Sequence, residues 1–154
     1  MQKDLGNIIP EFKNFDAAID EAFLGAEEGG IPIGSILTLN GDIVSKGHNR
    51  RIQNNSVILH AEMDCLEKAG RIDFSKCTLI TTLSPCDMCS GAILLYKIPT
   101  VIILDNINFK GSEDYLMSRG VDVTAFNNFR CVALMKEFIQ NNPKLWNEDI
   151  GIYE

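Results

Sequence analysis

The chain has 154 residues, of which 45% are hydrophobic and 23% are charged, a composition typical of a globular protein with one folded domain. The formal net charge is −7, and an acidic surface repels phosphate backbones, so the composition argues against a nucleic-acid partner. We expect no membrane partner, because no apolar run reaches the roughly 18 residues of a membrane-spanning helix. Residues 1–10 also lack the apolar stretch of a signal peptide.

The first third of the chain predicts a helix followed by a β-hairpin. The apolar face of the helix comprises Phe12, Phe15, Ile19, Phe23 and Ala26. These residues recur every three or four positions, and Gly29 and Gly30 end the helix. Residues 31–39 and 43–47 are typical of strands, and the Asn-Gly pair at 40–41 favours a type I′ hairpin turn between them.

From residue 60 onward, helices and strands alternate along the chain. The helical segments are 60–69, 85–97, 112–120 and 129–140, and the strand segments are 77–83, 100–106 and 121–126. Ser112 is expected to cap the helix that it begins. Five strands interleaved with helices predict an α/β fold, a three-layer α/β/α sandwich with a central five-stranded mixed sheet. We expect residues 1–154 to form one domain, with 143–154 as its C-terminal tail.

Cys86 and Cys89 form a C-x-x-C motif where the helix over 85–97 begins. Residues three apart lie on one face of a helix, so both sulfurs can reach one point, and a helix start favours thiolates. His60 stands at the start of another predicted helix. One imidazole and two thiolates leave the fourth position of a tetrahedral zinc ion open, which is typical of a catalytic site.

Glu62 lies two residues after His60. Zinc at an open site lowers the pKa of a bound water to roughly 7, and a nearby carboxylate can take up and deliver the protons of that water. The succession of H-x-E and P-C-x-x-C is the signature of zinc deaminases. Glu62 is therefore the candidate catalytic residue.

Two other interpretations of the cysteines stay open. Cys86 and Cys89 could be a redox pair, since they lie between a predicted strand and a predicted helix. A structural zinc ion would need a fourth ligand with suitable spacing; the candidates are His48, Cys65, Cys77 and Cys131. The odd total of five cysteines argues against a disulfide framework. We therefore expect a cytoplasmic protein, because that compartment keeps thiols reduced.

The sequence resembles the cytidine deaminase superfamily, and within it the branch of fungal-type cytosine deaminases. H-A-E at 60–62 and P-C-x-x-C at 85–89 are shared across the superfamily, whereas N-I-N-F at 106–109 and W-N-E-D-I-G at 146–151 are more specific to the branch. The resemblance implies a zinc-dependent enzyme that hydrolyses free cytosine to uracil and ammonia in pyrimidine salvage. It also implies a homodimer.

The same resemblance implies a role for each residue of the zinc motif. His60, Cys86 and Cys89 would hold one Zn²⁺ per subunit. Zinc hydroxide would attack C4 of the base, and Glu62 would shuttle the proton to N3 and then to the leaving amino group. Burial beside the substrate would raise the pKa of Glu62 to suit this task.

For the substrate, the resemblance implies four polar contacts. Asn49 and the backbone N–H of Ala61 would meet the O2 carbonyl, and the Ser84 carbonyl would accept from the exocyclic amine. Asp149 would accept from N1–H, which only the free base carries. The substrate is then a small molecule, cytosine or a 5-substituted cytosine.

Aromatic and aliphatic side chains are expected to enclose the base. By resemblance, Phe109 and Trp146 would cover the ring, and Ile33 and Leu83 would line the pocket. Residues 143–154 would act as a lid that gates substrate entry and product release.

Three rival functions share parts of this pattern. Deamination of guanine or cytidine would use the same zinc chemistry. A tRNA adenosine deaminase would need a basic groove, but the only basic cluster, Lys46, Arg50 and Arg51, is expected to be a solvated loop. A non-catalytic metal-binding or redox module is the rival from a different class.

Overall fold

The computed structural model describes residues 8–153. Residues 1–7, part of the segment in which we expect no signal peptide, and Glu154 of the expected tail lie outside the described part. The elements in chain order are η2 (Ile9–Asn14), α1 (Phe15–Glu27), β1 (Gly34–Leu39), β2 (Asp42–His48), α2 (Ala61–Ala69), η3 (Phe74–Lys76), β3 (Cys77–Thr81), α3 (Asp87–Leu95), β4 (Thr100–Ile103), α4 (Glu113–Ser118), β5 (Asp122–Ala125), α5 (Phe129–Asn141) and α6 (Pro143–Asp149).

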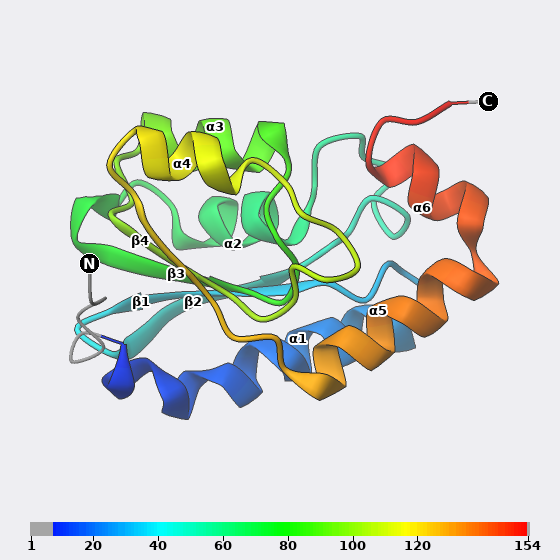
Figure 1. Cartoon of the computed structure of the whole chain (residues 1–154), viewed down its shortest axis with the longest axis horizontal. Helices are drawn as coiled ribbons and strands as arrows, with labels where there is room; N and C mark the ends of the chain where they lie inside the picture. The colour runs from blue at the N-terminus through cyan, green and yellow to red at the C-terminus, as the bar shows by residue number, and fades with distance from the viewer. Residues whose placement is uncertain (1–7, 154) are drawn as a thin grey trace.

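The strands form one five-stranded sheet in the order β2-β1-β3-β4-β5. β1 runs antiparallel to both β2 and β3, whereas β3, β4 and β5 are parallel to one another. Helices α2, α3 and α4 cover one face of the sheet, and α1 and α5 cover the other (Figure 1). The predicted three-layer sandwich with a mixed sheet is therefore confirmed.

Neighbouring residues of the central strands enter two separate cores. Leu37 and Leu79 pack with residues of α2, α3 and α4, whereas Ile36 and Ile80 pack with residues of α1 and α5. Successive strand side chains point to opposite faces, so a strand covered on both sides must be apolar throughout. A third cluster, which includes Ile33, Ala61 and Leu83, lies beneath the candidate site.

The hairpin between β1 and β2 turns where the sequence predicts it. Asn40 and Gly41 have φ values of 52° and 80°, the positive angles of a type I′ turn. Helix α1 packs so closely on β1 that a Cβ at Gly34 would collide with the backbone carbonyl oxygen of Ala18.

The first predicted helix begins later than its apolar face indicates. Phe12 lies in the 3-10 segment η2 and is 46% exposed. A 3-10 helix has three residues per turn, so its side chains fall out of phase with those of an α-helix. Phe12 instead makes edge contacts with the rings of Phe15 and Phe126.

Two helix starts differ in detail from what the sequence indicates. Ser112 is the N-cap residue of α4 as predicted, but its side chain makes no capping hydrogen bond; its hydroxyl donates to Asp87. The expected tail contains a helix, α6, in which Pro143 occupies the first turn, where its missing N–H and fixed φ are no disadvantage.

Across residues 8–153, none of the helices combines the length and the apolar character needed to cross a bilayer.

Candidate active site

Two helix starts bring the three predicted metal ligands together. His60 and Cys86 are the N-cap residues of α2 and α3, both with extended backbone, and Cys89 lies in the first turns of α3. One donor atom from each residue lies within 4.8 Å of the other two. His60 Nδ1 is 3.4 Å from Cys86 Sγ, so this ring nitrogen faces the sulfurs.

Hydrogen bonds, burial and charges within the site shift the pKa values of these three groups. A hydrogen bond from Cys89 lowers the pKa of Cys86 to about 4, although burial opposes this, and His60 adds to the lowering. The bond to Cys86 and burial raise the pKa of Cys89. Burial lowers the pKa of His60, but Cys86 and the carboxylates of Asp149 and Glu62 outweigh it and raise the value to about 9.

A cation with a preference for sulfur and imidazole fits this donor set. Zinc takes these ligands, and three of them leave its fourth position open. No fourth His, Cys, Asp or Glu donor joins the group within residues 8–153, which removes the structural four-ligand alternative for that part of the chain. His60, Cys86 and Cys89 are positioned to bind a metal.

Glu62 is buried beside the metal ligands, with 4% of its surface exposed. Its Oε1 accepts a hydrogen bond of 2.8 Å from Thr81 Oγ1 and one of 3.3 Å from Ser35 Oγ. Burial raises the pKa of Glu62, and the charge of His60 opposes the rise. A carboxyl group in this state can hold a proton more readily than an exposed one.

Ser35 and Thr81 were missed by the sequence analysis. Both are fully buried, on β1 and β3, and the Ser35 hydroxyl is 3.0 Å from that of Thr81. The available signal was a hydroxyl residue inside each of two apolar strands, since buried hydroxyl groups need partners.

A narrow cavity lies next to the metal ligands and Glu62. Its walls are Ile33, His60, Ala61, Glu62, Leu83, Ser84, Cys86, Phe109, Trp146, Asp149 and Ile150. All the predicted substrate-binding residues line it except Asn49. The accessible volume is about 20 Å³, room for little more than one water molecule.

An aromatic pair forms part of the cavity wall, and a wider groove adjoins the cavity. The rings of Phe109 and Trp146 meet edge to face, with centroids 5.8 Å apart. The outer groove, of about 500 Å³, shares His60, Cys86, Phe109 and Asp149 with the cavity. A small molecule that reached the cavity would therefore arrive through the groove.

The Phe109 segment is held by contacts that the sequence analysis also missed. Ser84 Oγ donates to Glu113 Oε2 at 2.6 Å and accepts from the backbone N–H of Gly111 at 2.9 Å. A Cβ at Gly111 would collide with the carbonyl oxygen of Pro85. This close approach of two backbones fixes the loop that carries Phe109.

Asn49 lies behind Asp149 and is fully buried. Its side-chain amide donates to Asp149 Oδ1 at 3.1 Å, and its Oδ1 accepts from the backbone N–H of Arg51 at 3.0 Å. The predicted contact of Asn49 with a substrate would use the amide hydrogen that Asp149 leaves free, and it stays a prediction.

Arg51 is not the solvated loop residue that we expected. It is only 6% exposed, and its guanidinium pairs with Glu148 and Asp149 of α6. Arg50 also has a partner, Asp64, whereas Lys46 is exposed as predicted but lies on strand β2 and not in a loop. Sequence spacing gave no signal for the Arg51 contacts, because 97 residues separate it from Glu148.

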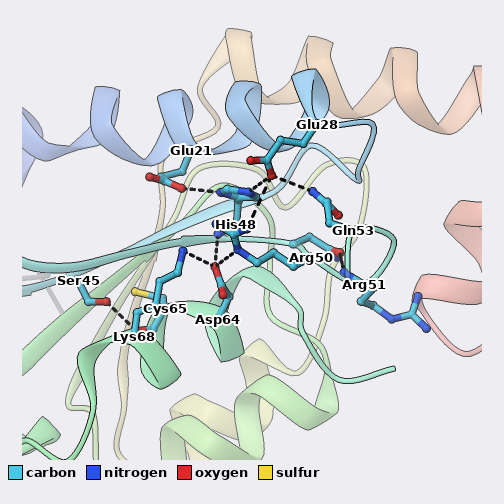
Figure 2. A network of polar contacts seen from close by, with 11 residues as sticks. Glu21, Glu28, Ser45, His48, Arg50, Arg51, Gln53, Asp64, Cys65 and Lys68 are labelled. Atoms are coloured by element: carbon cyan, nitrogen blue, oxygen red, sulfur yellow. Dashed lines mark hydrogen bonds and ion pairs between the residues drawn. The ribbon is translucent and has the colours of Figure 1, made fainter. Parts of the chain in front are cut away.

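His48, the other histidine, lies in a separate polar network (Figure 2). Its ring is fully buried, with Nδ1 2.7 Å from Glu21 of α1 and Nε2 2.6 Å from Glu28, the C-cap residue of that helix. Its backbone N–H donates to Asp64. Both ring nitrogens are thus engaged by carboxylates of α1 and its C-cap, and neither is left for a metal.

Cys65, Cys77 and Cys131 are buried free thiols. Burial raises the pKa of Cys65 and of Cys131 to about 12. They are core residues, as their hydrophobic neighbours indicate.

Comparison with known proteins gives the family. Residues 12–105, which include all three metal-binding side chains, match the model of the cytidine and deoxycytidylate deaminase zinc-binding region. A cytosine deaminase of Candida albicans is 48% identical over 143 residues, which cover 90% of this chain and 95% of that protein. A tRNA-specific adenosine deaminase of Streptococcus pyogenes is 40% identical over 101 residues, 62% of this chain and 64% of that protein.

A solved structure supports the fold. The guanine deaminase from Nitrosomonas europaea superimposes with a TM-score of 0.67 at 22% identity, over 80% of this chain and 81% of that one. Its likeness extends to the arrangement of sheet and helices alone. With the family model covering both zinc motifs, and a relative aligned almost from end to end, this chain belongs to the zinc-binding cytidine and deoxycytidylate deaminase family.

Proposed function

We propose that this protein hydrolyses free cytosine to uracil and ammonia, as an enzyme of pyrimidine salvage. The observation that carries the proposal is the buried Asp149 carboxylate, which shares one cavity with the zinc motif and Glu62. A nucleoside has its sugar on N1, where free cytosine has a hydrogen that a carboxylate can accept. The near end-to-end similarity to the Candida albicans enzyme supports the same substrate.

We assign one zinc ion per subunit to His60, Cys86 and Cys89. When bound there, zinc supplies Lewis acidity and an activated water at neutral pH. Glu62 would take one proton from that water and deliver it to N3 of the base, and would then carry the second proton of the same water to the amino group, which leaves as ammonia. The raised pKa of Glu62 favours this shuttling.

Backbone groups around the cavity orient the base. Ala61 is the first residue of α2, so its N–H has no partner inside the helix and is free to donate to O2. Asn49 donates to the same oxygen, and the Ser84 carbonyl accepts from the exocyclic amine. Asp149 accepts from N1–H.

Residues 143–154 act as the lid of a single catalytic domain. The cavity is too small for a pyrimidine while Trp146 and Phe109 close it, so entry requires α6 to move. Trp146 and Phe109 then cover the ring, and Ile33 and Leu83 form the apolar wall. Closure excludes water, which strengthens the polar contacts to the base.

We also propose a homodimer in the cytoplasm. Apolar side chains remain exposed around one groove of about 550 Å³; among its lining residues these are Ile58, Ile72 and Tyr96, with Leu95 adjacent. Apolar surface gathered in this way is typical of an interface. Light scattering of the purified protein would give twice the chain mass. The free thiols support a reducing compartment.

A substrate panel tests the proposed reaction. The purified protein, with its zinc content measured, is incubated with cytosine, 5-methylcytosine, cytidine, guanine, adenine and tRNA, and released ammonia is quantified. We expect turnover of cytosine without turnover of cytidine or tRNA adenosine. Turnover of cytidine and not of cytosine would refute the proposal, and salt-sensitive binding and deamination of tRNA would favour the adenosine deaminase reading.

A further inference from the structure

We propose that Arg51 is a positioning residue, which orients the Asp149 carboxylate and holds α6 closed over the cavity. Its effect on turnover rests on the proposed cytosine deaminase activity. The placement of α6 by Arg51 does not depend on that activity, and it can be measured without substrate.

The guanidinium of Arg51 binds the end of α6 through three contacts. Nη1 and Nη2 donate to the two carboxylate oxygens of Glu148 at 2.7 and 2.6 Å. Nη1 also lies 3.2 Å from Oδ1 of Asp149. A planar two-pronged pairing of this kind fixes direction as well as distance, which a lysine ammonium cannot do.

The other side of Arg51 is anchored in the loop between β2 and α2. Its Nε donates to the carbonyl of Val57 at 3.1 Å, and its backbone N–H donates to Asn49. The side chain points away from the His48 network and across to α6 (Figure 2). Arg51 therefore joins two segments that are distant in sequence and that both border the cavity.

These contacts determine which oxygen of Asp149 faces a ligand. Among the described residues, its hydrogen bonds and ion pairs all involve Oδ1, with donors Asn49 and Arg51 and with His60 Nε2 at 3.6 Å. Oδ2 is thereby left to accept from a molecule in the cavity. The Asp149 side chain is only 2% exposed, and a buried carboxylate needs fixed partners to offset the loss of its hydration.

The single tryptophan makes the placement of α6 measurable. Trp146 is the only Trp of the chain and is 6% exposed, one turn before Asp149. In Arg51→Met we expect Trp146 emission to shift to longer wavelength and acrylamide quenching to rise, with zinc content unchanged. KM for cytosine should rise about 10- to 100-fold, the range for a lost charge-assisted bond, while kcat changes less than about threefold.

Arg50→Met is the matched control, because it removes the same charge from the adjacent position, where the partner is Asp64. It should leave Trp146 quenching and KM as in the wild type. Glu148→Gln, at a half-exposed site, should give a smaller shift of both. Combining it with Arg51→Met should add little, because both changes break the same contact.

The results separate this inference from the proposed function. Arg51→Met with the quenching and KM of Arg50→Met would overturn the inference even if the wild type deaminates cytosine. A wild type inactive on cytosine would refute the proposed function, while the fluorescence would still decide the role of Arg51. If Arg51→Met does not fold, Glu148→Gln decides: unchanged quenching and KM would overturn the inference.

Discussion

Thr81 donates a hydrogen bond of 2.8 Å from its Oγ1 to Oε1 of Glu62, which ties a buried strand to the carboxylate beside the metal ligands. Thr81→Val keeps the shape of the side chain and removes this donor. We expect kcat to fall about 10-fold, because hydrogen bonds to charged groups contribute about 1.5–3 kcal/mol. Steady-state kinetics test this, with Thr78→Val on the same strand as the control. Equal kcat in the two variants would show that Thr81 does not position Glu62.

Glu62→Gln removes the proposed proton carrier and keeps the volume of the side chain. We expect kcat to fall by about 10²- to 10⁴-fold, the usual contribution of general acid–base catalysis. Thermal stability and zinc content should be retained, because a neutral amide at this buried position carries less desolvation cost than a carboxylate. Full activity in a zinc-loaded variant would remove Glu62 from the mechanism.

Zinc binding to the stripped protein should release protons. At pH 7 in the metal-free state, His60 (pKa about 9) and Cys89 (pKa raised) are protonated, whereas Cys86 (pKa about 4) is a thiolate. We therefore expect the ligands to release about two protons per zinc at pH 7 and about one above pH 9, where His60 is already neutral, with a further proton from the zinc-bound water as the pH rises through about 7. Calorimetry in buffers of different ionisation enthalpy measures the number. A count near zero at pH 7 would contradict this protonation pattern. Activity should disappear with the metal and return on adding zinc.

Gly111→Ala tests the loop that carries Phe109. The added Cβ meets the Pro85 carbonyl, so the loop must shift, and we expect a stability loss of about 1–3 kcal/mol together with lower kcat/KM. Gly91→Ala is the control, since nothing lies within 4 Å of its Cβ. That change should stabilise helix α3 by up to about 1 kcal/mol. Denaturant unfolding and kinetics of both variants decide; equal behaviour would rule out the close approach.

The predictable parts of the fold are those that depend on local sequence patterns. The strands that contain Ile36 and Ile80 are short, mainly apolar segments, and the turn at Asn40 and Gly41 depends on two neighbouring residues. The zinc motif was equally readable, because each half lies within four residues at a helix start. Helix α6 was not predicted, because its apolar residues Leu145 and Trp146 are adjacent and form no periodic face.

The unpredicted parts of the site depend on long-range contacts. The sequence predicts Arg51 as part of a solvated basic loop, whereas in the structure it pairs with Glu148, 97 residues away. Ser35 and Thr81 meet Glu62 from two different strands. In each case the residue type is common on a surface, and only the tertiary structure makes it a buried partner.

The position of α6 also has a practical consequence for fusion proteins. Asp149 and Tyr153 line the same outer groove, so any tag, reporter or surface anchor joined after Tyr153 would act close to the helix that covers the cavity. Segment η2 lies at the opposite end of the molecule (Figure 1). A cargo attached on that side would leave the helix unloaded, so the order of the two partners in a fusion should itself change how readily the base enters and leaves.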